Sequence, residues 1–420
     1  MSELLVSGGT PLQGSVAISG SKNAGLAIMS AVVMCAGETI LHNVPRISDL
    51  YAKIRLLEVF GAKVEWRGDA LAIDCSELLK TTPDEEVVKS IRTSFFMLGP
   101  LLARLGHIDM AAPGGCKIGA RPVDFHLRGL ATLGAQIQYE GGVYHATAER
   151  LTGGEIYFDV PSAGATQHLM TTAVYAEGST TIENAAQEPE VVALAGFLNR
   201  MGARIEGAGT QTITITGVKE LAPCEYTIPA DRMQAGTYMI AGAITKGDVT
   251  VTGVLPKDLT PVVNKLREAG AEVNEGNDWV QVQAPNGTKG IKVKTMPHPG
   301  FPTDMQQPMA ALLSVSEGTS VIEETLYEGR FGHIPELNKM GADIRSEGKL
   351  AVIQGVERLH GAPVEASDLR AGAALILAGL AADGETTVRN MKYVDRGYEN
   401  LEENLTALGG KVYRSAEAPL

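Results

Sequence analysis

Helix-like apolar runs and strand-like alternating runs follow one another six times along the chain. Each helix-like run ends on Gly-Ala or Gly-Gly, and the next residues alternate as in a strand, for example Lys63-Val64-Glu65-Trp66. Because glycine readily adopts the left-handed backbone that ends a helix, we expect a helix C-terminus at each of these glycines. They lie 73, 68, 68, 71 and 68 residues apart, at Gly61, Gly134, Gly202, Gly270, Gly341 and Gly409.

A second set of glycines keeps the same period. Each ends a run of small residues and is soon followed by a strand-like stretch such as Thr180-Thr181-Ile182. One repeat therefore contains a helix, a strand, a second helix and further strands, and its period of about 70 residues exceeds the ~20–50 of common solenoids. We predict an α/β fold of six such repeats, each with its own sheet. The second set is Gly37, Gly106, Gly178, Gly247, Gly318 and Gly384.

The two ends of the chain complement each other. The sixth repeat stops after residues 410–414 and lacks the later strands of the other five repeats. Residues 4–19, in turn, resemble the strands at 350–367 of the fifth repeat. We predict that the N-terminal segment completes the sixth repeat. One domain then comprises residues 22–229, and the other is discontinuous and comprises residues 1–21 and 230–420.

Composition and charge narrow the class of protein. The 420 residues are 44% hydrophobic and 20% charged, as in globular proteins, and the longest apolar stretches are shorter than the ~18–20 residues of a membrane span. No secretory signal pattern opens the chain, and the net charge of −13 argues against a nucleic-acid binder. We expect a soluble, cytoplasmic protein with neither a membrane nor a nucleic acid as partner.

Metal and cofactor motifs are missing from the sequence. The four cysteines form no CxxC pair, the eight histidines are scattered, and neither a GxGxxG fingerprint nor a Walker A loop occurs. We therefore expect no metal, no cofactor and no disulfide framework.

Charged residues recur at the start of each repeat's first helix, 14–15 residues before the second glycine. Five of the six positions are charged, although the helices are otherwise rich in Ala, Met and Leu: Lys22, Arg92, Gly164, Arg232, Asp304 and Arg370. Ordinary capping and solvation explain any one of them, but not the recurrence. A helix N-terminus attracts anions, and several Lys and Arg side chains suit a small substrate with several negative charges. Asp304 is then the one base among them.

The second repeat carries about four extra residues, in a loop at 113–122 that contains three glycines and Cys116. Most insertions are surface loops without a role. A thiol flanked by basic residues, however, is favoured as a reactive thiolate, so we predict a functional Cys116. Cys35, Cys75 and Cys224 have no such neighbours and are interpreted as inert.

Several motifs together resemble the UDP-N-acetylglucosamine 1-carboxyvinyltransferase family over essentially the whole chain. That resemblance implies two domains of three βαβαββ units each, in an inside-out α/β barrel. It also implies transfer of the enolpyruvyl group of phosphoenolpyruvate to the 3′-hydroxyl of UDP-N-acetylglucosamine, with release of phosphate by addition and elimination, as the first committed step of peptidoglycan synthesis. The motifs are Ser21-Lys22-Asn23-Ala24, the loop from Pro113 through Cys116 and Arg121 to Asp124, Phe301-Pro-Thr-Asp304, Gly329-Arg330-Phe331, Asp368-Leu-Arg370 and Asp395-Arg396-Gly-Tyr-Glu.

The resemblance further implies the roles of individual residues. Lys22, Cys116, Asp304 and Arg396 match catalytic positions, with Cys116 as the proton donor and fosfomycin target and Asp304 as the candidate base. An acid must hold its proton, whereas the basic loop favours thiolate, so the two requirements at Cys116 oppose each other. The implied substrate contacts, in which Phe125 and Leu326 depart mildly from the family pattern, are Lys22, Asn23, Arg92, Arg121, Pro122, Val123, Asp124, Phe125, Asp304, Leu326, Arg330, Arg370 and Arg396.

Three other functions compete with this interpretation. The sister transferase that acts on shikimate 3-phosphate has the same fold and donor but lacks the cysteine loop. A catalytically silent nucleotide-sugar binder would not need Lys22, Cys116, Asp304 and Arg396 together. A purely structural repeat protein would not need charges at the starts of apolar helices. No obligatory protein partner is implied.

Overall fold

The computed structural model describes residues 2–78, 82–83, 85–113 and 123–415. Contacts divide these residues into two compact units. The first unit lies between Gly20 and Pro229, and the second combines the residues before Gly20 with those after Pro229.

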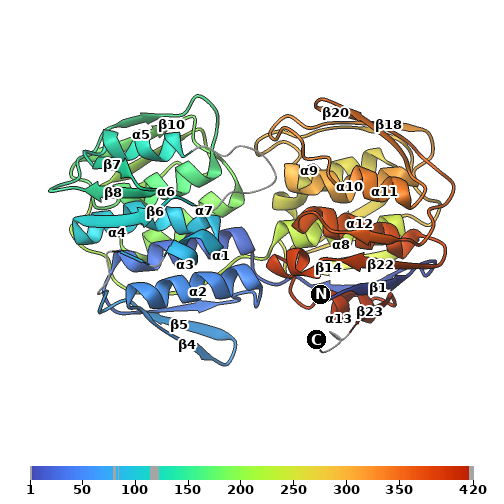
Figure 1. Ribbon diagram of the computed structural model, residues 1–420, viewed down its shortest axis with the longest axis horizontal. Coiled ribbons are helices and arrows are strands. Elements are labelled where there is room, and N and C mark those ends of the chain that lie inside the picture. Colours follow the sequence, from blue (N-terminus) through green and yellow to red (C-terminus); the bar gives the residue numbers. More distant parts are fainter. Residues whose placement is uncertain (1, 79–81, 84, 114–122, 416–420) are drawn as a thin grey trace. The chain divides into compact units, whose positions relative to one another are not determined.

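The first unit contains three repeats of helices and strands (Figure 1). Its helices are α1 (Lys22–Ala31), α2 (Ser48–Phe60), α3 (Glu85–Ser90), α4 (Leu98–Leu105), α5 (Asp124–Thr132), α6 (Ala163–Ala173) and α7 (Pro189–Met201), with 3₁₀ turns η1 (Val32–Met34) and η2 (Arg92–Met97). Its strands are β3 (Glu38–His42), β4 (Lys63–Arg67), β5 (Ala70–Asp74), β6 (His107–Ala111), β7 (Gln136–Glu140), β8 (Val143–Thr147), β9 (Glu155–Tyr157), β10 (Ser179–Glu183), β11 (Arg204–Glu206), β12 (Thr212–Thr216) and β13 (Glu225–Thr227).

The second unit repeats the same order of elements. Its helices are α8 (Arg232–Ile244), α9 (Pro256–Glu268), α10 (Gln306–Ser314), α11 (Ile334–Lys339), α12 (Leu369–Ala381) and α13 (Leu401–Ala407), with 3₁₀ turns η3 (Thr303–Met305) and η4 (Met391–Arg396). Its strands are β1 (Leu4–Ser7), β2 (Gln13–Ala17), β14 (Asp248–Thr252), β15 (Glu272–Glu275), β16 (Trp279–Gln283), β17 (Lys292–Lys294), β18 (Thr319–Glu323), β19 (Asp343–Glu347), β20 (Leu350–Gln354), β21 (Pro363–Glu365), β22 (Glu385–Arg389) and β23 (Lys411–Arg414).

Each repeat builds a small sheet from an antiparallel hairpin and the strand after its first helix. Among the described residues, five of the sheets have a fourth strand, which pairs in parallel at the edge and comes from the preceding repeat, as β13 does beside β3. Because β13 ends the first unit and β3 begins it, this pairing closes the three repeats into a ring. The strand orders are β13-β3-β5-β4, β6-β8-β7, β11-β12-β10-β9, β15-β16-β14-β2, β17-β18-β20-β19 and β21-β22-β1-β23.

The first helix of each repeat lies inside its unit, and the sheets lie outside. Every residue from Met233 to Ile244 in α8 and from Arg370 to Leu380 in α12 is buried. A helix that is apolar on all sides is stable only in an interior, and α8, α10 and α12 indeed contact one another between the sheets (Figure 1). None of the described helices has the length and hydrophobicity of a membrane-spanning helix.

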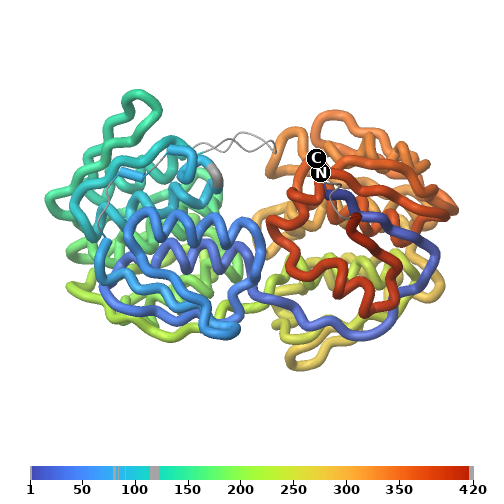
Figure 2. The backbone as a smooth tube through the Cα atoms, turned by 60° about the horizontal axis from the view of Figure 1, so that its bottom comes forward, coloured from blue at the N-terminus to red at the C-terminus, as the bar shows by residue number. Residues whose placement is uncertain are grey.

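The N-terminal segment supplies the strand that the sixth repeat lacks. β1 pairs antiparallel with both β22 and β23, with Leu4 opposite Val388 and Arg414. In Figure 2 this blue segment runs beside the red C-terminal segments. β2 then pairs in parallel with β14 and so closes the ring of the second unit.

All six glycines of the first set have the expected positive φ, and so do those of the second set except Gly247. There Lys246 adopts φ 56° in place of the glycine. A Cβ on Gly247 would lie 2.1 Å from the carbonyl oxygen of Leu12. The glycine is therefore required at this position for close packing of two backbones and not for a left-handed turn.

Two of the first helices begin as 3₁₀ turns, which the apolar pattern did not predict. In the second repeat η2 precedes α4, and in the fifth repeat η3 precedes α10. Pro100 and Pro308 are each the third residue of the α-helix that follows. Proline lacks an N–H and its ring clashes with the carbonyl four residues earlier, which disfavours an α-helical hydrogen-bond ladder on its N-terminal side.

Candidate functional site

The charged residues expected at helix starts lie there in the structure. Lys22, Arg92 and Arg232 are the first residues of α1, η2 and α8, and Asp304 and Arg370 are the second residues of η3 and α12. A cation at a helix N-terminus opposes the helix dipole at a cost of roughly 0.3–1 kcal/mol. The second helices have the opposite, stabilising arrangement, with an acid in the first turn: Asp49, Asp124, Glu190, Asp258, Glu336 and Glu402. The cations on the first helices thus point to anion binding.

In the second unit, Asp304 accepts hydrogen bonds from two buried guanidinium groups, and we call these three residues the Asp304 cluster. Its Oδ1 lies 2.7 Å from Nη2 of Arg330, and its Oδ2 lies 3.1 Å from Nε and Nη2 of Arg370. The arginine side chains are only 3% and 2% exposed, whereas the Asp304 side chain is 28% exposed. Three residues that are far apart in sequence thus form one charged group with a solvent-accessible carboxylate.

Neighbouring groups keep both arginines charged despite their burial. Burial lowers the pKa of Arg330, but Asp304 outweighs this effect and the net pKa is raised. Burial acts on Arg370 in the same way, and Tyr398, Asp304 and Asp231 together raise its pKa above the ordinary value. The cluster therefore holds two charged guanidinium groups, the kind of donor that binds anionic ligands, and Asp231 and Asp368 are further acidic groups that act on them.

A chain of buried hydrogen bonds fixes the position of the Arg330 side chain. Its Nη1 donates to Thr303 Oγ1 at 2.8 Å, and Thr303 Oγ1 donates to Glu324 Oε2 at 2.8 Å. Glu324 is fully buried, and its Oε1 accepts from Thr295 Oγ1 at 2.8 Å and from the backbone N–H of Leu326 at 2.9 Å. The same acid thus fixes both Arg330 and the backbone at Leu326, whose side chain is 40% exposed.

A second buried chain holds Arg370. Its Nη1 donates to the hydroxyl of Tyr398 at 3.0 Å, which lies 2.9 Å from Thr237 Oγ1. Because the Thr237 hydroxyl donates to the carbonyl of Met233, the Tyr398 hydroxyl donates to Thr237 and accepts from Arg370. Tyr398 belongs to a quoted motif, but its role as a support for Arg370 was not visible from sequence.

In the first unit, Lys22 pairs with an acid from the next helix. Its Nζ lies 2.7 Å from Asp49 Oδ2, and the side chains are 12% and 8% exposed. Ser21 caps α1 by accepting from the backbone N–H of Ala24 at 3.3 Å. Asp49 was not singled out from sequence, although it is the acid in the first turn of α2.

The remaining expected contacts lie at element ends or outside the described residues. Asn23 is exposed on α1, Arg92 is half-buried, and Arg396 is half-buried as the last residue of η4. Cys116 and its neighbours Arg121 and Pro122 lie outside the described residues.

The start of α5 carries three further expected contacts. Val123 precedes the helix, and Asp124 is its exposed first residue. Phe125 packs against Phe158, with ring centroids 5.4 Å apart. The larger ring that departs from the family pattern thus has a packing partner within the same unit.

The other three cysteines have the environment of inert thiols. Burial raises the pKa of Cys35 to about 11 and that of Cys75 to about 12. Burial also raises the pKa of Cys224, which is half-buried. These thiols therefore remain protonated at neutral pH, as interpreted from their sequence neighbours.

Lys53 on α2 is a fully buried amine that the sequence analysis did not single out. Its Nζ donates to the carbonyl of Thr93 at 3.1 Å, and burial lowers its pKa well below the ordinary value. Lys53 therefore loses its proton at a lower pH in the folded protein than in the unfolded chain. Stability must therefore rise with pH between the folded-state pKa and the ~10.4 of an unfolded lysine.

Wild-type protein is expected to gain stability relative to Lys53→Met by up to about 1.4 kcal/mol per pH unit between pH 7 and 9. Denaturant unfolding of both proteins at pH 7, 8 and 9 measures this difference. A difference that stays constant with pH would show that Lys53 is charged in the folded protein.

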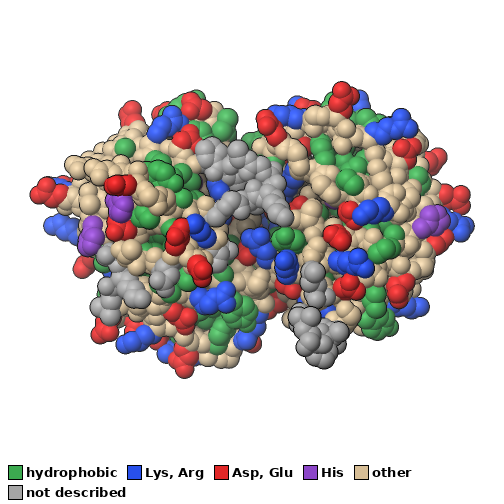
Figure 3. Space-filling model, viewed as in Figure 1, with side chains coloured by type: hydrophobic (Ala, Val, Ile, Leu, Met, Phe, Trp, Pro, Cys, Tyr) green, Lys and Arg blue, Asp and Glu red, His purple; other side chains and the backbone are tan. Residues whose placement is uncertain are grey.

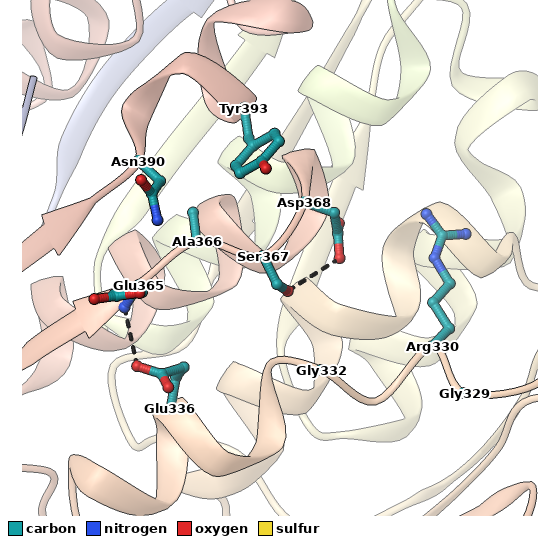
Figure 4. Close-up of a pocket in the computed structure, with 10 residues that line it drawn as sticks. All are labelled: Gly329, Arg330, Gly332, Glu336, Glu365, Ala366, Ser367, Asp368, Asn390 and Tyr393. Atoms are coloured by element: carbon teal, nitrogen blue, oxygen red, sulfur yellow. Dashed lines mark hydrogen bonds between the residues drawn. The ribbon is translucent and has the colours of Figure 1, made fainter. Parts of the chain in front are cut away.

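A pocket of about 340 Å³ lies in the second unit, beside the Asp304 cluster. Arg330 and Asp368 lie at one end of it, and Glu336 and Glu365 at the other (Figure 4). Arg330 is the one expected substrate contact that lines this pocket. The other lining residues are Gly329, Gly332, Ala366, Ser367, Asn390 and Tyr393.

Surface charge is mixed on the face shown in Figure 3, where Lys and Arg side chains alternate with Asp and Glu. Among the described residues, no group of three or more His, Cys, Asp or Glu side chains is arranged to hold a metal ion.

Solved structures and curated proteins resemble this chain over its whole length. The enolpyruvyl transferase NikO from Streptomyces tendae superposes with a TM-score of 0.89 at 27% identity and covers 100% of this chain and 99% of its own. An EPSP synthase from Acinetobacter baumannii has the same fold at 20% identity, with a TM-score of 0.78 and coverage of 99% of this chain and 100% of its own. These likenesses confirm the predicted two-domain α/β fold.

Two curated relatives with higher sequence identity than these structures have the same enzyme name. UDP-N-acetylglucosamine 1-carboxyvinyltransferase 3 of Symbiobacterium thermophilum is 49% identical over 414 residues, which are 98% of this chain and 98% of the relative. UDP-N-acetylglucosamine 1-carboxyvinyltransferase 2 of Carboxydothermus hydrogenoformans is 48% identical over 419 residues, or 99% of this chain and 100% of the relative. The family model described as EPSP synthase (3-phosphoshikimate 1-carboxyvinyltransferase) matches residues 6–405. The chain therefore belongs to the EPSP synthase family.

Proposed function

We propose that this protein is an enzyme that transfers the enolpyruvyl group of phosphoenolpyruvate to the 3′-hydroxyl of UDP-N-acetylglucosamine. The observation that carries the proposal is the 49% identity over nearly the whole length to a relative named for this reaction. The Asp304 cluster and the cations at helix starts support it, because both substrates are polyanions. Phosphoenolpyruvate carries a phosphate and a carboxylate, and the nucleotide sugar carries a diphosphate.

The proposed reaction proceeds by addition and elimination. The Cys116 thiol donates a proton to C3 of phosphoenolpyruvate, which makes C2 electrophilic, and the sugar 3′-oxygen forms a bond to C2. The proton of the sugar hydroxyl passes to Asp304, whose carboxylate is the accessible member of its cluster. The Cys116 thiolate then takes a proton from C3, and the C2–O bond to phosphate breaks. The leaving phosphate takes up the proton held by Asp304, and the enolpyruvyl ether and inorganic phosphate are the products.

The basic residues have electrostatic roles in this proposal. Lys22 and Asn23 contact phosphoenolpyruvate, and Arg121, Arg370 and Arg396 bind its phosphate and carboxylate. Charge that moves between carboxylate and phosphate during the reaction is stabilised best by donors that are already fixed in place. The buried supports of Arg370 and Arg330 provide such fixed donors.

The nucleotide sugar has its own set of proposed contacts. These contacts are Arg92, residues 121–125, Asp304, Leu326 and Arg330. We treat the two units as the two domains of the enzyme. Because both substrates are soluble small molecules, we place the reaction in the cytoplasm, at the first committed step of peptidoglycan synthesis, without a cofactor.

Phosphate release from phosphoenolpyruvate tests the proposal. Release is expected with UDP-N-acetylglucosamine and not with shikimate 3-phosphate, the acceptor named by the family description. Release with shikimate 3-phosphate alone would assign the sister activity. Tight binding of the nucleotide sugar without any release would make the chain a silent binder.

A further inference from the structure

The first unit contains a buried polar cluster that the proposed mechanism does not use, formed by Lys53, His126 and His168. The three side chains come from α2, α5 and α6, one from each repeat of the unit. Lys53 is fully buried, His168 is 1% exposed and His126 is 7% exposed. We call these residues the Lys53 cluster.

Hydrogen bonds fix the tautomer of both imidazoles. Nε2 of His168 accepts from the backbone N–H of Gly99 at 2.8 Å, so the ring proton of a neutral His168 lies on Nδ1. Nδ1 of His168 lies 2.8 Å from Nδ1 of His126 and therefore donates to it. The proton of a neutral His126 is consequently on Nε2.

Packing leaves the two rings little freedom to move. Phe96 stacks on both imidazoles, with centroid distances of 5.6 Å to His126 and 6.3 Å to His168. Phe95 meets both rings edge-on at 5.5 and 5.9 Å. A Cβ on Gly99 would lie 2.7 Å from Nε2 of His168, so only glycine permits this approach of α4 to the ring.

The cluster touches the elements that carry the proposed nucleotide-sugar contacts. Nζ of Lys53 holds the carbonyl of Thr93, the residue directly after Arg92. His126 lies on α5 two residues after Asp124. The positions of Arg92 and of the start of α5 are thus tied to the same buried group.

Burial and neighbouring positive charge disfavour the protonated forms of these three side chains. Burial, together with the charge of Arg92, lowers the pKa of His126 to about 3. Burial, His126 and Lys53 lower the pKa of His168 well below its ordinary value, and burial lowers that of Lys53. Replacing buried polar groups of this kind with apolar ones is often neutral or stabilising, so stability alone does not explain them.

We infer that the Lys53 cluster is a positioning device that holds Arg92 and the N-terminus of α5 in the geometry that binds the nucleotide sugar. The inference rests on the proposed function. Its residues act through Arg92 and Asp124 and touch no reacting atom, so they affect acceptor binding more than the chemical step.

The variant Lys53→Met keeps the length of the side chain and removes the amine that holds Thr93. We expect the KM for UDP-N-acetylglucosamine to rise about tenfold, while kcat and the KM for phosphoenolpyruvate change less than about twofold. The melting temperature at pH 7 should stay equal or rise. A merely structural lysine predicts the reverse, namely lower stability with an unchanged KM.

Two substitutions at His168 separate its two hydrogen bonds. His168→Gln places an oxygen where Nε2 accepts from Gly99 and loses the donor to His126, whereas His168→Asn keeps a donor near His126 and loses the acceptor for Gly99. We expect the KM for UDP-N-acetylglucosamine to rise about fivefold in His168→Gln and less than about twofold in His168→Asn. Equal values for the two variants would overturn the role of the His126 link.

Thr166→Val is the matched control on the same helix. Thr166 is fully buried, and its Oγ1 accepts from the backbone N–H of Ala186 at 3.0 Å, away from Arg92 and α5. This variant should lower the melting temperature and leave the KM unchanged. An active wild type with unchanged KM in Lys53→Met overturns the inference alone, whereas a wild type that neither binds the nucleotide sugar nor releases phosphate overturns the proposed function.

Discussion

Asp304→Asn is expected to lower kcat about 10³-fold and to destabilise the protein by about 2–3 kcal/mol. The asparagine keeps the shape of the side chain but removes the carboxylate that pairs with both Arg330 and Arg370. Two guanidinium groups that are 3% and 2% exposed then lose their counter-charge, and water cannot replace it. The loss should lie at the low end for a buried pair, because Asp304 itself is 28% exposed.

Steady-state phosphate release and denaturant unfolding of the same preparation measure both effects. Glu323→Gln is the matched control in the same unit, since Glu323 on β18 pairs with Lys294 on β17 at 2.9 Å and both side chains are exposed. This change should shift stability by less than about 0.5 kcal/mol and leave kcat unaltered. An Asp304→Asn enzyme with a kcat within tenfold of wild type would rule out Asp304 as the base.

The architecture could be predicted because every repeat has the same local structural requirement. A buried helix has to end and reverse within a few residues, and glycine is the residue that permits this at Gly61 and its equivalents. The repeat pattern also indicated that the sixth repeat lacked a strand, and β1 supplies this strand. The part of the prediction that was wrong is local. Two helices begin as 3₁₀ turns just before Pro100 and Pro308, and the pattern of apolar positions does not reveal this.

The charged members of the site were visible from sequence, whereas their partners were not. Lys22, Asp304 and Arg370 recur at one position of the repeat, so symmetry identifies them without knowledge of contacts. Tyr398 has no such recurrence, and the acid that recurs in the first turn of the second helices, Asp49 among them, is explained by the helix dipole alone. Each is recognised only when the fold places it against a charged residue 27 or 28 positions away.

The Lys53 cluster was even less visible from the sequence than Tyr398 and Asp49. Lys53 lies in a helix with ordinary polar and apolar spacing, and His126 and His168 are 42 residues apart. Nothing in their sequence neighbourhoods distinguishes a buried lysine from a solvated one. Burial, which gives these residues their chemistry, is a property of the fold.

Cys116→Ala is expected to reduce phosphate release from phosphoenolpyruvate and UDP-N-acetylglucosamine about 10³-fold, because general acid catalysis contributes ~10²–10⁴-fold. Binding of the nucleotide sugar, measured by calorimetry, should remain within about threefold of wild type, since the thiol is proposed to act on phosphoenolpyruvate. Cys116→Ser should be nearly as slow, because a hydroxyl is a far weaker acid than a thiol. Release that survives in Cys116→Ala would keep the reaction and move the proton donor to another group.

The pH dependence of kcat/KM distinguishes the two protonation states of Cys116. The basic loop favours the thiolate, whereas the role as general acid requires the protonated thiol. If the protonated thiol is the acid, kcat/KM for phosphoenolpyruvate falls as the pH rises through the thiol pKa of the free enzyme. If the thiolate is the active form, kcat/KM rises over the same range. We expect the fall, since addition cannot begin until C3 gains a proton, and a thiolate has none to give. A rise with pH that disappears in Cys116→Ala would instead make Cys116 a nucleophile and assign the proton transfer to a different residue.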